Sequence, residues 1–190
     1  MIVNGHIHTR YLYTIREAER VHDNVMGALV PAASDIIKIK GKAGSWECIF
    51  FQKEDKSCEI YDQRPLECRI LKCWDTREIE AVYKKNRLVR RDLLKDMGEL
   101  WELIQLHEEQ CSHEMINNAI QDLGGTSGKQ ASEKIIAAVQ YDRAIRQLIT
   151  EKGQVTDDML DFLFGRPLTQ ALKTAGCRIE KVDHAYRVKK

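Results

Sequence analysis

The chain has 190 residues, of which 43% are hydrophobic, and its 30 basic and 29 acidic side chains leave a formal net charge of +1. This length can bury a hydrophobic core without disulfide bonds, and the charge balance excludes a general electrostatic attraction to nucleic acid or anionic membranes. The N-terminus lacks a secretory pattern, and no apolar run approaches the ~20 residues that a membrane helix requires. We therefore expect a cytoplasmic protein with no nucleic-acid and no membrane partner.

The first 74 residues have the pattern of strands and turns rather than of helices. The alternation in Trp46-Glu-Cys-Ile-Phe50 predicts that Trp46, Cys48 and Phe50 share one face of a strand. Residues 16–25 are also compatible with a short helix. The β-prone runs lie at residues 11–15, 36–40, 46–51 and 58–61.

After Asp75-Thr76 the apolar period changes to 3.6, which predicts helices. Two helices are expected to be broken near Met97-Gly98, and residues 124–130 have the composition of a flexible linker. The tail at residues 178–188 alternates weakly, as a hairpin or a ragged end would. Further helices are expected at residues 131–150, 156–164 and 168–175.

These patterns predict an α+β protein that is mainly α. We expect a small, irregular strand-and-loop lobe carrying the cysteines over residues 1–75, followed by a helical lobe over residues 76–190.

Four of the six cysteines form a cluster within 26 residues: Cys48, Cys58, Cys68 and Cys73. Such density without a secretory signature favours metal ligands over disulfides. Four loop-borne thiolates can surround one zinc ion at ~2.3 Å even without a CxxC motif. On a helix Cys68 and Cys73 would point in different directions, so binding one ion requires a turn or a helix end there. A redox or disulfide pair and inert buried thiols are the alternatives.

Three cations are interspersed with the cluster, at Arg64, Arg69 and Lys72. Positive neighbours lower the pKa of a thiol and offset the negative charge of a four-thiolate centre, so we expect them to surround the ligands. Pairing with nearby acidic side chains at a hydrated surface is the other interpretation of each cation.

Outside the cluster the candidates for chemistry are weaker. His107 and Cys111 would share a helical face at i,i+4 spacing, as a metal pair requires, but a helix-end histidine and a half-buried cysteine explain the same residues, and we prefer that interpretation. Cys177 is expected to be a small core residue. The chain shows no Ser-His-Asp or Cys-His-Asn grouping, and its catalytic residues, if it has any, stay unknown.

The segment from Cys58 to Cys73 has the pattern C-x-I-Y-x-x-R-P-x-x-C-R-x-x-x-C, with Cys48 upstream. This pattern resembles the YkgJ family of bacterial cysteine-cluster proteins, which are described as zinc- or iron-chelating. The resemblance implies that the four cysteines are the second set of ligands in an eight-cysteine arrangement. Relatives carry a CxxCxxCC motif ahead of this set, and no such motif precedes Cys48. Either the chain starts later than its relatives or it keeps half of the ligands.

We therefore expect a metal-binding protein with a four-thiolate site for zinc or iron, closed by its four protein ligands and leaving no open position. One alternative is a redox or accessory enzyme in which the same thiolates hold an iron–sulfur cluster. A metal-free helical interaction module is another. The specific reaction and any protein partner are unknown.

Overall fold

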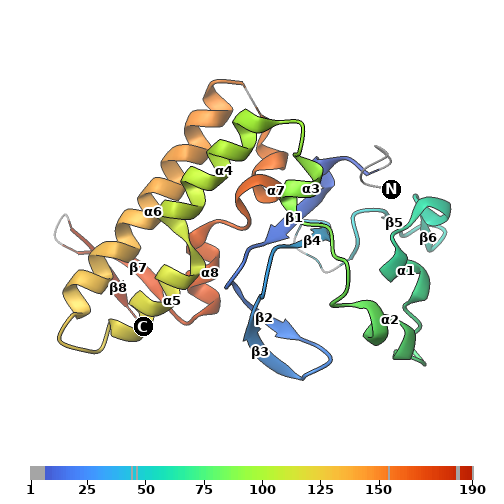
Figure 1. Cartoon of the computed structure of the whole chain (residues 1–190), viewed down its shortest axis with the longest axis horizontal. Helices are drawn as coiled ribbons and strands as arrows, with labels where there is room; N and C mark the ends of the chain where they lie inside the picture. Colours follow the sequence, from blue (N-terminus) through green and yellow to red (C-terminus); the bar gives the residue numbers. More distant parts are fainter. Residues whose placement is uncertain (1–6, 44, 46, 154, 183–184, 190) are drawn as a thin grey trace.

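The computed structural model describes residues 7–43, 45, 47–153, 155–182 and 185–189, without the side chains of residues 181, 182 and 185. It confirms the predicted fold class, because the protein is a mixed α+β structure that is mainly helical. In the described residues the strands form separate antiparallel pairs (Figure 1). None of the described helices combines the length and the apolarity needed to cross a bilayer.

The first sheet joins β1 (Leu12–Ile15) to β4 (Ile36–Ile39), and both strands confirm their predictions. Between them, β2 (Arg20–Asp23) and β3 (Ala28–Pro31) form a hairpin. The helix considered for residues 16–25 is therefore wrong. Ala18 takes a positive φ of 59°, and the carboxylate of Asp23 accepts hydrogen bonds from the backbone N–H groups of Val25 and Met26, which closes a turn instead.

The cysteine segment is more irregular than its alternation predicts. The strand expected over residues 46–51 is wrong, because Cys48 forms only an isolated bridge with Gly41 and the chain then turns into the short strand β5 (Phe51–Gln52). Phe50 is buried in the core, whereas Cys48 is exposed, and Trp46 lies outside the described residues.

The second half of this segment is a short strand followed by short helical turns. Strand β6 (Ser57–Cys58) is followed by a 3₁₀ turn at Tyr61–Gln63 and by helix α1 (Leu66–Ile70), which begins directly after Pro65. The strand predicted over residues 58–61 is thus confined to its first residue.

The helical half has more helices than predicted in its first part. Its elements are α2 (Arg77–Val82), α3 (Arg90–Leu93), α4 (Gly98–Cys111), α5 (His113–Asp122), α6 (Gly128–Glu151), a 3₁₀ turn at Asp157–Met159, α7 (Leu160–Phe164), α8 (Leu168–Thr174), β7 (Arg178–Val182) and β8 (Ala185–Lys189). The helix expected before Met97-Gly98 is divided into α2 and α3, and α4 is followed by the separate helix α5. The break expected near Met97-Gly98 is confirmed by the start of α4, and the tail forms a hairpin. The linker expected over residues 124–130 is a shorter, tight turn, because α6 already begins at Gly128; backbone hydrogen bonds from Gly125 to Asp122 and from Gly128 to Gly125 hold it.

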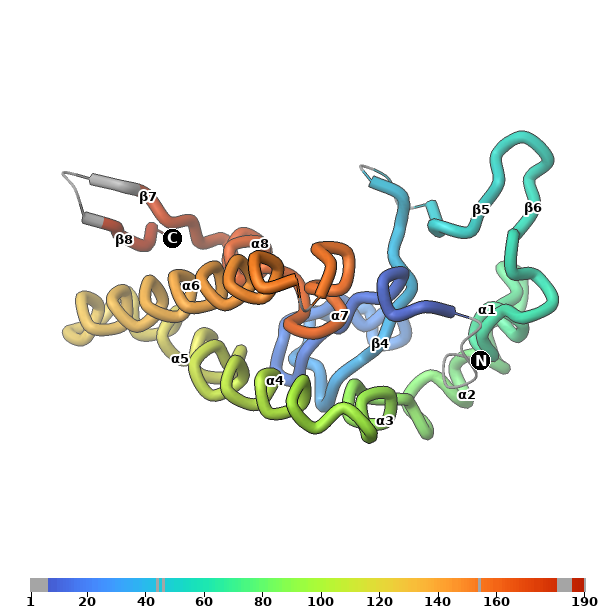
Figure 2. Tube along the Cα trace, turned by 90° about the horizontal axis from the view of Figure 1, so that it is seen from above, coloured from blue at the N-terminus to red at the C-terminus, as the bar shows by residue number. Residues whose placement is uncertain are grey.

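Two clusters of buried side chains stabilise the molecule. The first contains Leu12 and Phe50 from the strand region together with Ile104 and Phe162 from the helices, and the second lies between α5, α6 and α8. The hydroxyl of Thr14 also donates a 2.6 Å hydrogen bond to the carbonyl of Phe162, which attaches β1 to α7. The core thus draws residues from both sides of residue 75. Figures 1 and 2 place β5, β6, α1 and α2 to one side of the layer formed by α4, α5 and α6.

Candidate metal centre

The β5–β6 hairpin brings Cys48 and Cys58 to neighbouring positions of the backbone. Phe51 pairs with Cys58 across the two strands, and the N–H of the same Phe51 donates a 2.9 Å hydrogen bond to the carbonyl of Cys48. Two cysteines that are ten positions apart in the sequence therefore lie at the same end of this hairpin.

Cys68 lies on α1 and is electrostatically coupled to both of these thiols. Burial raises the pKa of Cys68, the nearby thiols of Cys48 and Cys58 and the carboxylate of Glu67 raise it further, and Arg64 lowers it. The Cys68 thiol therefore lies within electrostatic range of Cys48 and Cys58, although no three ligand-type side chains of the described residues gather closely enough to hold an ion.

Cys73 is placed differently from the other three cysteines. Helix α1 has ended, and Cys73 lies in a turn closed by a 3.2 Å hydrogen bond from the N–H of Asp75 to the carbonyl of Lys72. The influences of Cys48 and Cys58 on Cys68 exceed any influence of Cys73. Cys73 thus lies in a turn and Cys68 on a helix, which agrees with the different directions that a five-residue spacing gives two side chains on a helix.

The clustered thiols are accessible and unbridged. None of the four clustered cysteines forms a disulfide bond; Cys48, Cys68 and Cys73 are exposed and Cys58 is half-buried. Within the described residues, no three side chains of His, Cys, Asp or Glu are close enough together to hold a metal ion. The donor atoms fit zinc or iron by chemical type, but their sulfurs do not gather into a coordination shell.

The three cations near the cluster have separate surroundings. The guanidinium of Arg64 donates a 2.7 Å hydrogen bond to the carbonyl of Tyr61 and stacks over the Tyr61 ring, where it acts on Cys68. The ammonium of Lys72 lies 2.6 Å from the carboxylate of Glu78. Arg69 is exposed on α1. Arg64 is thus the cation that influences a clustered thiol.

A network of buried charges, which the sequence did not reveal, lies in the centre of the molecule. Arg16 is fully buried, and its guanidinium donates hydrogen bonds to Nδ1 of His107 at 3.2 Å and to the Glu108 carboxylate at 3.1 Å. It also donates to the carbonyl of Cys111 at 2.8 Å. Because a guanidinium only donates, Nδ1 of His107 accepts, and its Nε2–H donates to Asp142 at 2.8 Å. Burial lowers the pKa of His107, so the imidazole is neutral at pH 7.

Further arginines extend this network to other elements. Arg146 donates to Asp142 at 2.9 Å and to the carbonyl of Gly165 at 2.8 Å, while Arg90 joins Asp35 and Glu108, each at 2.6 Å. We call the following residues the buried charge network: Arg16, Glu19, Asp35, Arg90, His107, Glu108, Asp142, Arg146 and Arg166. Its four guanidinium groups match its four carboxylates, so it is electrically balanced.

The network argues against His107 and Cys111 as a metal pair. Both are more deeply buried than the helix-end histidine and half-buried cysteine that the sequence predicted, and His107 lies within α4 and not at its end. Both are fully buried, His107 is occupied by Arg16 and Asp142, and the Cys111 thiol points to the carbonyl of Ala138 at 3.3 Å. Burial raises the pKa of Cys111 to about 12, so its thiolate is not available to a metal. Cys177 is also buried, as expected.

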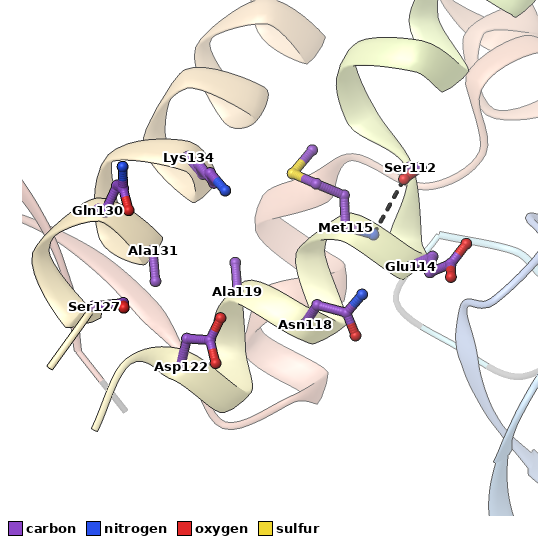
Figure 3. A pocket seen from close by; sticks show the side chains of 10 residues that line it. All are labelled: Ser112, Glu114, Met115, Asn118, Ala119, Asp122, Ser127, Gln130, Ala131 and Lys134. Carbon is purple, nitrogen blue, oxygen red and sulfur yellow. Dashed lines mark hydrogen bonds between the residues drawn. The ribbon is translucent and has the colours of Figure 1, made fainter. Parts of the chain in front are cut away.

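A hollow of about 400 Å³ lies between α5 and α6, away from the cysteines (Figure 3). Its floor is formed by Ala119 and Ala131, and its walls carry the polar ends of Asn118, Asp122 and Lys134. None of the clustered thiols lines it.

The cysteine segment is similar to a known family of domains. Residues 11–93 match the family model CxxCxxCC, described as "Putative zinc- or iron-chelating domain". The match covers less than half of the chain and includes all four clustered cysteines, although no cysteine precedes Cys48. No curated protein and no solved structure matches the chain.

Proposed function

We propose that the chain binds zinc or iron through the thiolates of Cys48, Cys58, Cys68 and Cys73. One observation carries this proposal: the stretch similar to a chelating domain contains all four cysteines, and its β5–β6 hairpin brings Cys48 and Cys58 to the same end. Thiolates are the ligands that zinc and iron–sulfur centres prefer, and four of them are enough for one tetrahedral ion.

Each residue of the segment would contribute in a distinct way. The hairpin orients Cys48 and Cys58, helix α1 presents Cys68, and the turn after α1 presents Cys73. Each thiol must lose its proton to bind, and the positive charge of Arg64 favours this at Cys68. A bound ion would supply a cross-link between the hairpin and α1.

The same four cysteines also suggest a family and a place in the chain for metal binding. We place the cysteine pattern with the second ligand set of the YkgJ family, and we assign metal binding to residues 1–75, with residues 76–190 as the helical lobe that supports them. The match to the chelating domain over residues 11–93 is consistent with this assignment.

Elemental analysis of protein purified without oxygen tests the proposal directly. We expect about one zinc or iron per chain in the native protein, and its loss when all four clustered cysteines are changed to serine. Cys177→Ala is the matched control, since Cys177 is a core residue, and it should retain the metal. Native protein without either metal, even after reconstitution, would contradict the proposal.

A further inference from the structure

A second, smaller hollow lies beside α5, and none of the clustered cysteines lines it. Its volume is about 20 Å³, which is enough for one water molecule or for one oxygen atom of a ligand. The lining includes Glu19 and Arg20 at the start of β2, His113, Ile116 and Ile120 on α5, and Arg166 just before α8. We call it the His113 hollow.

The imidazole of His113 has a buried nitrogen without a hydrogen-bond partner. The residue is only 4% exposed, and its Nε2 forms no hydrogen bond with the described residues. The Glu19 carboxylate is 3.6 Å from Nε2, which is beyond hydrogen-bond distance. It still favours the tautomer with the proton on Nε2, because a bare nitrogen would turn its lone pair towards the negative oxygen. A buried N–H group without an acceptor is costly, so His113 requires an acceptor that its neighbours do not supply.

Positive charge is in excess at the His113 hollow. Arg166 is paired with Glu19, to which its Nε donates at 2.9 Å. The side chain of Arg20 is exposed and forms no ion pair with the described residues. Two guanidinium groups therefore face one carboxylate beside a neutral imidazole. The acceptor that fits these surroundings is an anion.

The rest of the lining is apolar and comes from two helices. Ile116 and Ile120 are buried on α5, and Ala171 and Ala175 line the same hollow from α8. An aliphatic group against these side chains would be removed from water, which favours binding by about 0.8 kcal/mol for each buried CH₂. A ligand that combines a negative charge with a short apolar part would thus use the whole lining.

We propose that the His113 hollow binds a small carboxylate that carries a short aliphatic chain. One carboxylate oxygen accepts the Nε2–H of His113, Arg20 pairs with the negative charge, and the chain lies on Ile116 and Ile120. Because Nε2 is covered by its neighbours, the entering oxygen must displace a side chain slightly, which favours a small ligand. None of these contacts involves the cysteine cluster, so the site is independent of the proposed metal.

Titration of the full chain with butyrate tests the proposal. The side-chain nitrogens of His113 are followed by NMR and are assigned by their loss in His113→Gln. We expect a saturable shift of Nε2 with a Kd of about 1 mM, which is reasonable for so few atoms. Butyramide has the same size without the charge and should give no comparable shift at equal ionic strength. The absence of a saturable shift with butyrate, or equal shifts from the two compounds, would overturn the proposal.

Chloride tests whether the aliphatic part matters. It carries the same charge but cannot cover Ile116 and Ile120, so we expect no saturable shift of His113 over the same concentrations. A response equal to that of butyrate would show binding of an adventitious ion only and would overturn the assignment to a carboxylate with an aliphatic chain.

Variants then separate the charge from the hydrogen bond, with binding followed through the backbone amide resonances of α5. Arg20→Met should weaken butyrate binding about fivefold, and the matched control Arg143→Met, at an exposed position of α6, should not. His113→Leu removes the donor and should abolish binding, whereas the amide of His113→Gln should restore part of it. Unchanged affinity in Arg20→Met would overturn the proposal even if His113→Leu failed to fold, which circular dichroism would reveal.

Discussion

The buried charge network and the cysteine cluster are both made of groups that require a partner. In the network each guanidinium faces a carboxylate of the same chain, and the fully buried Arg16 is bonded to groups of α4. The clustered cysteines lie close together in the sequence and are mostly exposed. The chain thus pairs the charges of the network internally, whereas the proposed metal would complete the cluster from outside.

The largest effect should follow from removing the central cation of the network. Arg16→Met leaves the carbonyl of Cys111 and part of the Glu108 carboxylate buried without a donor, and we expect a loss of about 3–5 kcal/mol in the free energy of unfolding. Urea denaturation measures it. Arg143→Met, on the exposed face of α6, should change stability by less than about 0.5 kcal/mol. A similar small loss for Arg16→Met would show that the network is dispensable.

Acid should destabilise the fold through His113, which lies beside Glu19 of the buried charge network. Burial, assisted by Arg16 and Arg166, lowers the pKa of His113 to about 3, and its Nε2 lies 3.6 Å from Glu19. Below pH 6.5 the unfolded chain binds a proton at this imidazole and the folded chain does not. Stability should therefore fall by about 1.4 kcal/mol per pH unit as the pH decreases from 6.5 towards 3.

The variant His113→Gln removes this imidazole and isolates its contribution. It should reduce the slope of the free energy of unfolding against pH by the amount that one bound proton contributes, about 1.4 kcal/mol per pH unit at most. Urea denaturation between pH 7 and 5 measures this slope. His107, whose pKa is also lowered by burial, still contributes a slope in the variant. An identical slope in the variant and the native chain would exclude His113 as a source of the decline.

The two regions also differ in how far the sequence predicts them. The cysteines are close together in the chain, so their spacing alone selected Cys48, Cys58, Cys68 and Cys73. Arg16 and His107 are 91 residues apart, and no local pattern indicates that they touch. The same limit explains the arrangement within the cluster, because the separation of Cys73 depends on where α1 ends.

The secondary structure, too, was predicted where local sequence determines it and missed where distant residues do. Alternation predicted β1 and β4, and the 3.6 period predicted α6, because each element buries one face along its whole length. The predicted strand at residues 46–51 failed because Phe50 is drawn into the core by residues distant in sequence, including Leu12 and Ile104. The turn at Ala18 was missed because a positive φ at alanine has no sequence signal.

A change that crowds the backbone without involving a charge should have a smaller effect on stability than Arg16→Met. A Cβ atom at Gly128 would lie 2.5 Å from the carbonyl oxygen of Leu123, so Gly128→Ala must displace the turn between α5 and α6. We expect a loss of about 1 kcal/mol in the free energy of unfolding. Gly124→Ala in the same turn meets no atom within 4 Å and should be nearly neutral. Equal losses would indicate a general helix-turn effect and not the contact with Leu123.

The smallest effect on the core should come from removing the metal. Zinc would join the hairpin to α1, whereas α4 and α6 are held by the buried charge network and the core. We expect a chelator to speed hydrogen exchange roughly tenfold at residues 66–74 and to leave α4 and α6 unchanged. Arg16→Met should give the opposite pattern, with faster exchange in α4 and α6, because it weakens global stability. If chelation accelerated exchange in all of these elements equally, the cluster would be part of the cooperative core, and the contrast between the two regions would be lost.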